Sequence, residues 1–151
     1  MSIFNALNTS ASALTAQRFR MDVISSNIAN AETTRATINE DGEYEPYRRK
    51  MVALEPNQSH FKSFLHKEKQ LSQNATAGVK VSRIVHDQEP FKLEYNPTHP
   101  DADESGYVQL PNVDPLKEMV DLMGATRSYE ANITSLNATK SMLMKALEIG
   151  K

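Results

Sequence analysis

The sequence contains no cysteine and no tryptophan, and it has few aromatic residues of any kind. Without cysteine the chain forms no disulfide, performs no thiol chemistry and holds no cysteine-ligated metal. Hydrophobic residues make up 39% of the 151 residues, below the ~45–50% that is usual for a globular domain. The core available to one chain is therefore small, which predicts either an elongated molecule or one that completes its burial against partners.

The sequence has no large excess of positive or negative charge, since its formal net charge is -2 at pH 7. This balance gives no electrostatic argument for binding nucleic acid or an anionic membrane. The short basic run "YRRK", which ends at Lys50, is interpreted as a solvated strand face rather than a phosphate-binding site.

Long apolar runs are missing as well. No segment approaches the ~20 consecutive apolar residues that a transmembrane helix needs. Residues 2–17 carry no charge and the first basic residue is Arg18, so we expect no cleavable secretory signal, which requires a basic start. If the protein leaves the cytoplasm, it needs another export route.

The residues of catalytic and metal-binding motifs are absent or badly spaced. None of the four histidines lies at a close ligand spacing from another. Residues 101–104, "DADE", are not followed by the distal glutamate of a calcium loop. The sequence has no glycine-rich phosphate loop and no G-x-S-x-G. We therefore expect no enzymatic activity, no metal, no other cofactor and no small-molecule substrate.

What the sequence does contain is a heptad pattern at each end. In residues 3–31 one row recurs every seven residues and a half-polar second row precedes it by four, which predicts a helix with a coiled-coil face. The rows are Leu7, Leu14, Met21 and Ile28, and Ile3, Ser10, Gln17, Ile24 and Ala31.

A second heptad pattern occupies residues 115–149. Asp114 can cap this helix and Pro115 suits its first position. Gly124 is its one helix breaker and is either a tolerated flaw or a point of close approach by another backbone. The two rows are Leu122, Tyr129, Leu136 and Leu143, and Met119, Thr126, Ile133, Lys140 and Leu147.

The segment between the two helices is rich in turn residues and short strand patterns. Strands are predicted at residues 47–54, 79–85, 91–95 and 107–110, whereas "TINEDGEYEP" reads as loop and residues 59–70 are ambiguous. The predicted fold class is α+β: long antiparallel terminal helices forming a coiled coil, with a small β-rich insert. The predicted segments are 1–34, 35–112 and 113–151, in a rod-like molecule with its termini at one end.

Asn27 and Asn30 stand where the first helix is expected to end, within "ISSNIANAETT". One interpretation is an ordinary helix terminus, where asparagine satisfies carbonyls or takes the left-handed conformation. The other is amide pairing across a helix interface, which fixes register. Because both heptad patterns are half polar, we expect the terminal helices to become firm only when packed against other subunits.

"SSNIANAETT" (25–34) resembles the S-x-N-(I/L)-A-N-x-x-T segment of the bacterial flagellar rod and hook proteins. Residues 118–150 resemble the C-terminal helix of that family, with its E-M-V, R-x-Y-x-A-N and K-x-M-x-x-x-x-L positions. Residues 96–115 are similar to one rod protein in particular. The three elements in this order cover nearly the whole chain and are more specific than any one alone.

The resemblance implies a structural subunit of the basal-body proximal rod, which polymerises helically through its terminal helices into a drive shaft that transmits torque to hook and filament. It implies a periplasmic position, export through the flagellar type III apparatus without a cleavable signal, self-association, and the partners FlgB, FlgF, FlgG and FliE. The residues implied in subunit packing are Ile3, Leu7, Leu14, Met21, Ile24, Asn27, Ile28 and Asn30, and Met119, Leu122, Arg127, Tyr129, Asn132, Ile133, Leu136, Leu143 and Leu147.

One alternative is a cytoplasmic coiled-coil adaptor or flagellar export chaperone, which explains the heptads but not the β-rich insert. A small cell-wall hydrolase is a further class, and it would need acidic residues converging in a cleft.

Overall fold

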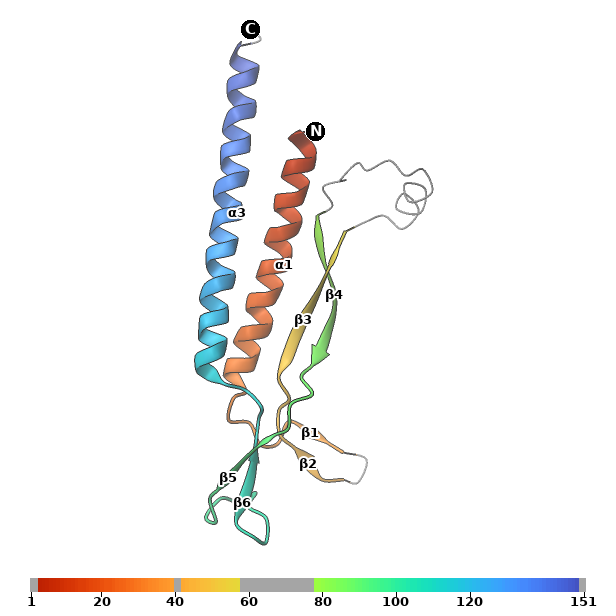
Figure 1. Ribbon diagram of the computed structural model, residues 1–151, viewed down its shortest axis with the longest axis vertical. Coiled ribbons are helices and arrows are strands. Elements are labelled where there is room, and N and C mark those ends of the chain that lie inside the picture. Colours follow the sequence, from red (N-terminus) through yellow and green to blue (C-terminus); the bar gives the residue numbers. More distant parts are fainter. Residues whose placement is uncertain (1–2, 40–41, 58–77, 150–151) are drawn as a thin grey trace, which may run out of the picture. The chain divides into compact units, whose positions relative to one another are not determined.

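The computed structural model describes residues 3–39, 42–57 and 78–149 (Figure 1). Along the chain, the described residues form a long helix α1 (Ile3–Ala29), then six short strands, then a second long helix α3 (Pro115–Ile149). The strands form three two-stranded sheets, in which β1 pairs with β2, β3 with β4 and β5 with β6. The strands are β1 (Thr37–Ile38), β2 (Tyr44–Glu45), β3 (Lys50–Pro56), β4 (Val79–His86), β5 (Lys92–Tyr95) and β6 (Tyr107–Leu110). The α+β fold class is confirmed.

Both predicted helices are present, and their ends follow local hydrogen bonding. The N–H of Leu116 donates to Asp114 Oδ1 over 3.0 Å, so Asp114 caps α3 as predicted. α1 ends at Ala29, two residues before the predicted end. There the N–H of Asn30 still donates to Ser26 O in the helical pattern. The N–H groups of Ala31 and Thr33 instead donate to carbonyls three residues earlier, which form turns between α1 and β1.

Three of the four predicted strands match within one residue, but the expectation for residues 47–54 was wrong at its start. β3 begins at Lys50 because the preceding residues pair elsewhere: the N–H of Tyr47 donates to Thr33 O and that of Arg49 to Asn112 Oδ1. The loop assignment of "TINEDGEYEP" was also wrong, since it holds the β1–β2 hairpin. Residues 59–70 lie outside the described residues.

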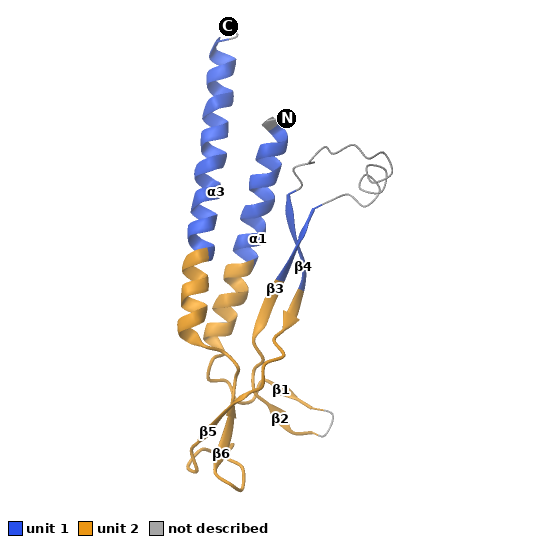
Figure 2. Cartoon of the chain, viewed as in Figure 1, with its two compact units in different colours: residues 1–19, 53–83, 125–151 blue, residues 20–52, 84–124 orange. Residues whose placement is uncertain are grey.

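The chain divides into two compact units (Figure 2). Unit 1 comprises residues 1–19, 53–83 and 125–151, and unit 2 comprises residues 20–52 and 84–124. Most of the buried hydrophobic side chains belong to unit 2, where the end of α1 meets the start of α3 and the roots of the hairpins. They are Val23, Ile24, Tyr47, Val108 and Val113, whereas unit 1 buries Ala16 and Ala125. The described core is as small as the composition predicted.

In unit 1 the start of β4 lies directly on α1. The backbone N–H of Val79 donates a hydrogen bond to the side chain of Ser12, with 3.1 Å between Val79 N and Ser12 Oγ. A Cβ added at Gly78 would lie 2.3 Å from Ser12 Oγ and 3.0 Å from Ser12 Cβ. Glycine at position 78 therefore allows the strand to approach the helix this closely.

Gly78→Ala is expected to destabilise unit 1 by roughly 1–3 kcal/mol, because the new methyl group must displace Ser12 or the strand. Urea unfolding of the purified chain, followed by circular dichroism, measures the loss. In a Ser12→Ala background the same change should cost less, because the nearest clashing atom is gone. An equal loss in both backgrounds would contradict the proposed contact.

Candidate functional site

The side chain of Asn27 lies at the centre of a group of buried polar residues in unit 2. Its amide nitrogen donates to Lys50 O over 2.9 Å and to Glu118 Oε2 over 3.0 Å. Its oxygen accepts from the N–H of Lys50 and from the hydroxyl of Tyr47, both over 3.0 Å. With 1% of its surface exposed, Asn27 thus makes the four hydrogen bonds that an amide side chain can make.

Arg49 supplies the positive charge of this group. Its Nε donates to Glu118 Oε1 over 2.7 Å, and its Nη1 lies 3.1 Å from Asp87 Oδ2. Glu118 is 1% exposed, and a carboxylate that deep requires a paired cation and further hydrogen bonds. Arg49 and Asn27 provide both.

Asn112 completes the group by joining two loops. Its oxygen accepts from the N–H of Arg49 over 2.8 Å, and its nitrogen donates to Glu89 O over 3.2 Å. We call the set the polar cluster, and it consists of Asn27, Tyr47, Arg49, Asp87, Asn112 and Glu118. It ties the end of α1 to the root of β3, the segment after β4, the segment before α3 and the first turn of α3.

Two acidic side chains that join separate segments of unit 2, Asp87 and Asp101, have lowered pKa values and are held in their charged form. A hydrogen bond from the N–H of Glu89, followed by the guanidinium of Arg49, lowers the pKa of Asp87. Hydrogen bonds from Arg35 and then Thr34 lower the pKa of Asp101. The bond between Arg35 Nε and Asp101 Oδ1 is 2.7 Å long. It attaches the segment after β5 to the segment that leads from α1 into β1.

These lowered pKa values predict acid sensitivity. A carboxyl group whose pKa is lower in the folded state stabilises the fold above its unfolded pKa, and that stabilisation is lost as the pH falls through the folded pKa. We therefore expect the urea midpoint to be flat near neutral pH and to fall below about pH 4. Asp101→Asn should make the acid decline shallower. The titration of the urea midpoint from neutral pH to pH 3 measures both, and an identical slope in the variant would contradict the assignment.

Asn27 and Asn30, singled out together in the sequence, have different environments. The side chain of Asn30 donates from Nδ2 to Ser26 O over 2.8 Å, which satisfies a carbonyl at the helix end. Asn27 instead joins α1 to α3 within the chain through Glu118. Asn30 therefore agrees with the helix-terminus interpretation, whereas Asn27 bonds a carboxylate, a hydroxyl and backbone groups of its own chain and no second amide side chain.

The other residues implied in packing on α1 are mostly half-buried within the single chain. Ile3 belongs to the first turn of α1, and Ile24 is buried. The remaining four are half-buried: Leu7, Leu14, Met21 and Ile28.

On α3 the two predicted heptad rows behave differently. Leu122, Tyr129, Leu136 and Leu143 are half-buried, and so is Asn132, whose nitrogen donates to Ser128 O. Within the single chain the more buried positions, Glu118, Ala125, Asn132 and Thr139, each lie one residue before a position of the second predicted row. Met119, Ile133 and Leu147 are consequently exposed, as is Arg127.

Most of the polar cluster does not follow from the sequence. The interpretation of the run that contains Arg49 as a solvated strand face was wrong, because the Arg49 side chain is 14% exposed and ion-paired. Asp87, Asn112 and Glu118 were not identified. The one feature of the sequence that pointed to this cluster was Asn27, a polar residue at the end of a helix with a heptad pattern. Its side-chain partners Tyr47 and Glu118 lie 20 and 91 residues further along the chain, so no local pattern connects them.

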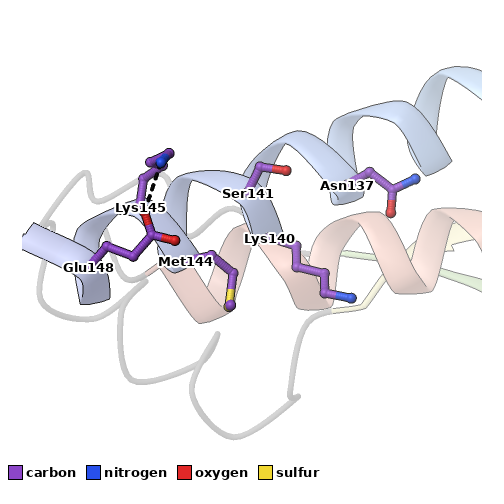
Figure 3. A pocket seen from close by; sticks show the side chains of 6 residues that line it. All are labelled: Asn137, Lys140, Ser141, Met144, Lys145 and Glu148. Atoms are coloured by element: carbon purple, nitrogen blue, oxygen red, sulfur yellow. Dashed lines mark hydrogen bonds and ion pairs between the residues drawn. The ribbon is translucent and has the colours of Figure 1, made fainter.

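The described residues form no recognisable catalytic centre. A hollow of about 460 Å³ lies against α3, and the described side chains that line it all come from that helix (Figure 3). Its lining is Asn137, Lys140, Ser141, Met144, Lys145 and Glu148. Within the described ranges no group of three or more histidine, aspartate or glutamate residues is arranged to hold a metal ion. None of the described helices combines the length and apolarity needed to span a bilayer.

Two family descriptions match this chain. Residues 7–37 match "Flagella basal body rod protein", and residues 104–149 match "Flagellar basal body rod FlgEFG protein C-terminal". Together with the long terminal helices, these matches define the class as a structural component of the flagellar basal-body rod.

Similarity to individual proteins extends over the whole chain. It is 63% identical over 151 residues to the flagellar basal-body rod protein FlgC of Bacillus subtilis (strain 168), with all of both chains covered. It is 44% identical over 155 residues to FlgC of Borreliella burgdorferi, covering 99% of this chain and 98% of that one. Identity to FlgC of Salmonella typhimurium is 41% over 151 residues, again with full coverage. The chain belongs to the FlgC family of flagellar basal-body rod proteins.

Family membership decides between the alternatives of the sequence analysis. It supports a structural rod component rather than a cytoplasmic adaptor, an export chaperone or a cell-wall hydrolase. It also implies assembly with other rod components at the flagellar basal body.

Proposed function

We propose that this chain is a subunit of the proximal rod that polymerises helically through its terminal helices and transmits torque toward hook and filament. The observation that carries the proposal is apolar surface left over on α3 after it has packed within its own chain. Leu147 is 69% exposed, and Ile133 and Met119 are exposed as well. Exposed apolar surface of this kind marks protein–protein contact.

The proposed partners are the rod proteins FlgB, FlgF and FlgG and the adaptor FliE, together with further copies of this chain. The route to the rod is the flagellar type III export apparatus, without removal of a signal. The polar cluster supports the mechanical part of the proposal, because it joins the hairpin roots to the helix ends with buried charged and amide groups.

The test replaces two exposed apolar residues of α3 in a strain that lacks its own copy. The double variant Ile133→Asp with Leu147→Asp should leave the strain non-motile and the chain missing from isolated basal bodies. The purified variant should unfold at the wild-type urea midpoint, because both side chains are exposed.

The matched control keeps these positions apolar, as Ile133→Leu with Leu147→Met. It should restore swimming and incorporation. Wild-type swimming of the aspartate variant would contradict assembly through this helix.

A further inference from the structure

The outer face of the β5–β6 hairpin is apolar and exposed. In the antiparallel register Tyr95 lies opposite Tyr107, and Leu93 opposite Gln109. Because directly opposed residues share a face and neighbours alternate, the residues Leu93, Tyr95 and Tyr107 point to one side. Val108 lies on the other side and is buried. Leu93 is 66% exposed and both tyrosines are exposed. We call these three residues the hairpin patch.

The hairpin patch is held in a fixed shape. The two tyrosine rings pack edge to face with their centroids 5.3 Å apart. Gly106, in the turn before β6, has φ +81°, and a Cβ there would lie 3.0 Å from the Tyr95 ring and 3.2 Å from Pro97 Cβ. A side chain at position 106 would therefore push the Tyr95 ring away. The patch is a small, preformed aromatic platform, which loses little side-chain freedom on binding.

The first two turns of α3, also in unit 2, carry a second apolar surface. Leu116, Met119, Val120 and Met123 follow the i, i+3, i+4, i+7 spacing of one helix face, and all four are exposed. The same turns bury Glu118 in the polar cluster, so the helix is anchored while this face stays open. We call these four residues the helix patch. It is about 11 Å long at 1.5 Å per residue.

We propose that the hairpin patch of one copy docks on the helix patch of a second copy. The two surfaces are complementary in shape, since unbranched methionine side chains adapt to rigid aromatic rings and sulfur–aromatic contact is favourable. Exposed residues of opposite charge also lie beside the two patches. Asp103 and Glu104 are exposed beside the hairpin patch, where the N–H of Asp103 donates to Tyr107 O. Lys117 is exposed beside the helix patch.

The second copy must present the helix patch rather than a second hairpin patch. Two hairpin patches face to face would bring the acidic pairs of both copies together. They would also form a closed two-fold dimer, whereas a head-to-tail contact between different surfaces repeats into an open helical assembly. This contact rests on the proposed function, because it requires copies that meet in a rod.

The absence of cysteine from the wild-type sequence allows a direct test. Leu93→Cys and Val120→Cys copies with different tags are co-expressed in a strain lacking its own copy, and isolated basal bodies are treated with a short bis-maleimide cross-linker. We expect a mixed dimer that carries both tags. Neither variant expressed alone should cross-link to itself. The matched control pairs Leu93→Cys with Met142→Cys, an exposed methionine of α3 outside the helix patch, and should give no mixed dimer.

The outcomes separate this contact from the proposed function. Basal bodies that contain both variants without a mixed dimer, or with Leu93→Cys linked to itself or to a different rod protein, overturn the contact and leave the rod function standing. Exclusion of Leu93→Cys or Val120→Cys from basal bodies that accept Met142→Cys also overturns it, because the docking has room for a cysteine at either place. Absence of all three variants and of the wild-type chain from basal bodies overturns the proposed function itself.

Discussion

Arg49→Ala is expected to lower the free energy of unfolding by about 3–5 kcal/mol, because it leaves the buried carboxylate of Glu118 without a cation. The side chain also pairs with Asp87, so two acidic groups lose their counter-charge in one change. Urea unfolding of the purified chain measures the loss. Tyrosine fluorescence gives a second signal, to which Tyr47 of the polar cluster contributes.

A control for this result is Arg20→Ala. Arg20 lies 3.7 Å from Asp121, and both side chains are more than one third exposed. Solvent screening makes such a pair worth less than about 1 kcal/mol. Equal destabilisation by the two substitutions would mean that the buried position of Glu118 does not govern the effect.

Asn27→Asp is expected to destabilise the fold by about 3 kcal/mol or more at neutral pH, although the two side chains have nearly the same shape. The new oxygen would face Glu118 Oε2 across 3.0 Å and Lys50 O across 2.9 Å, where the amide now donates. Both donors are lost. Two buried carboxylates at this distance cannot both stay charged, so the pair should hold a proton and its pKa should rise.

The sign of the pH dependence distinguishes this variant from the wild-type chain. A pKa that is higher in the folded state makes stability greatest at acidic pH, and the stability declines as the pH rises through the folded pKa. The urea midpoint of Asn27→Asp should therefore rise from neutral pH toward about pH 5, where the wild type is flat. Asn30→Asp, at the helix end, should lose only about 1 kcal/mol. A flat midpoint for Asn27→Asp would show that Glu118 is not its neighbour.

These two variants test the feature that fixes the geometry of unit 2. The polar cluster joins segments that come from both ends and the middle of the chain. Its groups satisfy one another, and a network of that kind holds one arrangement more strictly than apolar packing does. A rod subunit needs its hairpins held firmly to its helices if force is to pass between them.

The helices were predictable because their signals are local and repeated. Seven-residue rows, an Asp-Pro start and the lack of interior proline define α1 and α3 within two residues. The two-residue strands β1 and β2 were not predictable, because an alternation of hydrophobic and polar residues cannot show in two residues. They exist because Gly42, with φ +84°, lets the chain reverse and the N–H of Asn39 reach Glu43 O.

The burial of α3 positions one residue before the predicted row also could not be predicted from a local pattern. A heptad pattern read from apolar residues alone favours the row of Met119, Ile133 and Leu147. The chain instead turns Glu118, Ala125 and Asn132 inward. Ala125 is small enough for close packing. Glu118 can be buried because its carboxylate accepts hydrogen bonds from Arg49 and Asn27. The apolar row is left outside, where the proposed assembly uses it.

The sequence by itself determined the two terminal helices, the β-rich middle, the small core and the resemblance to flagellar rod and hook proteins, because each depends on residue spacing and composition along one stretch of chain. Only the tertiary structure decided that Asn27, Arg49 and Glu118 form one buried cluster and that the apolar row of α3 faces outward. The physical reason is that the burial of a charge depends on partners from distant parts of the chain, and no local pattern encodes which of them will meet.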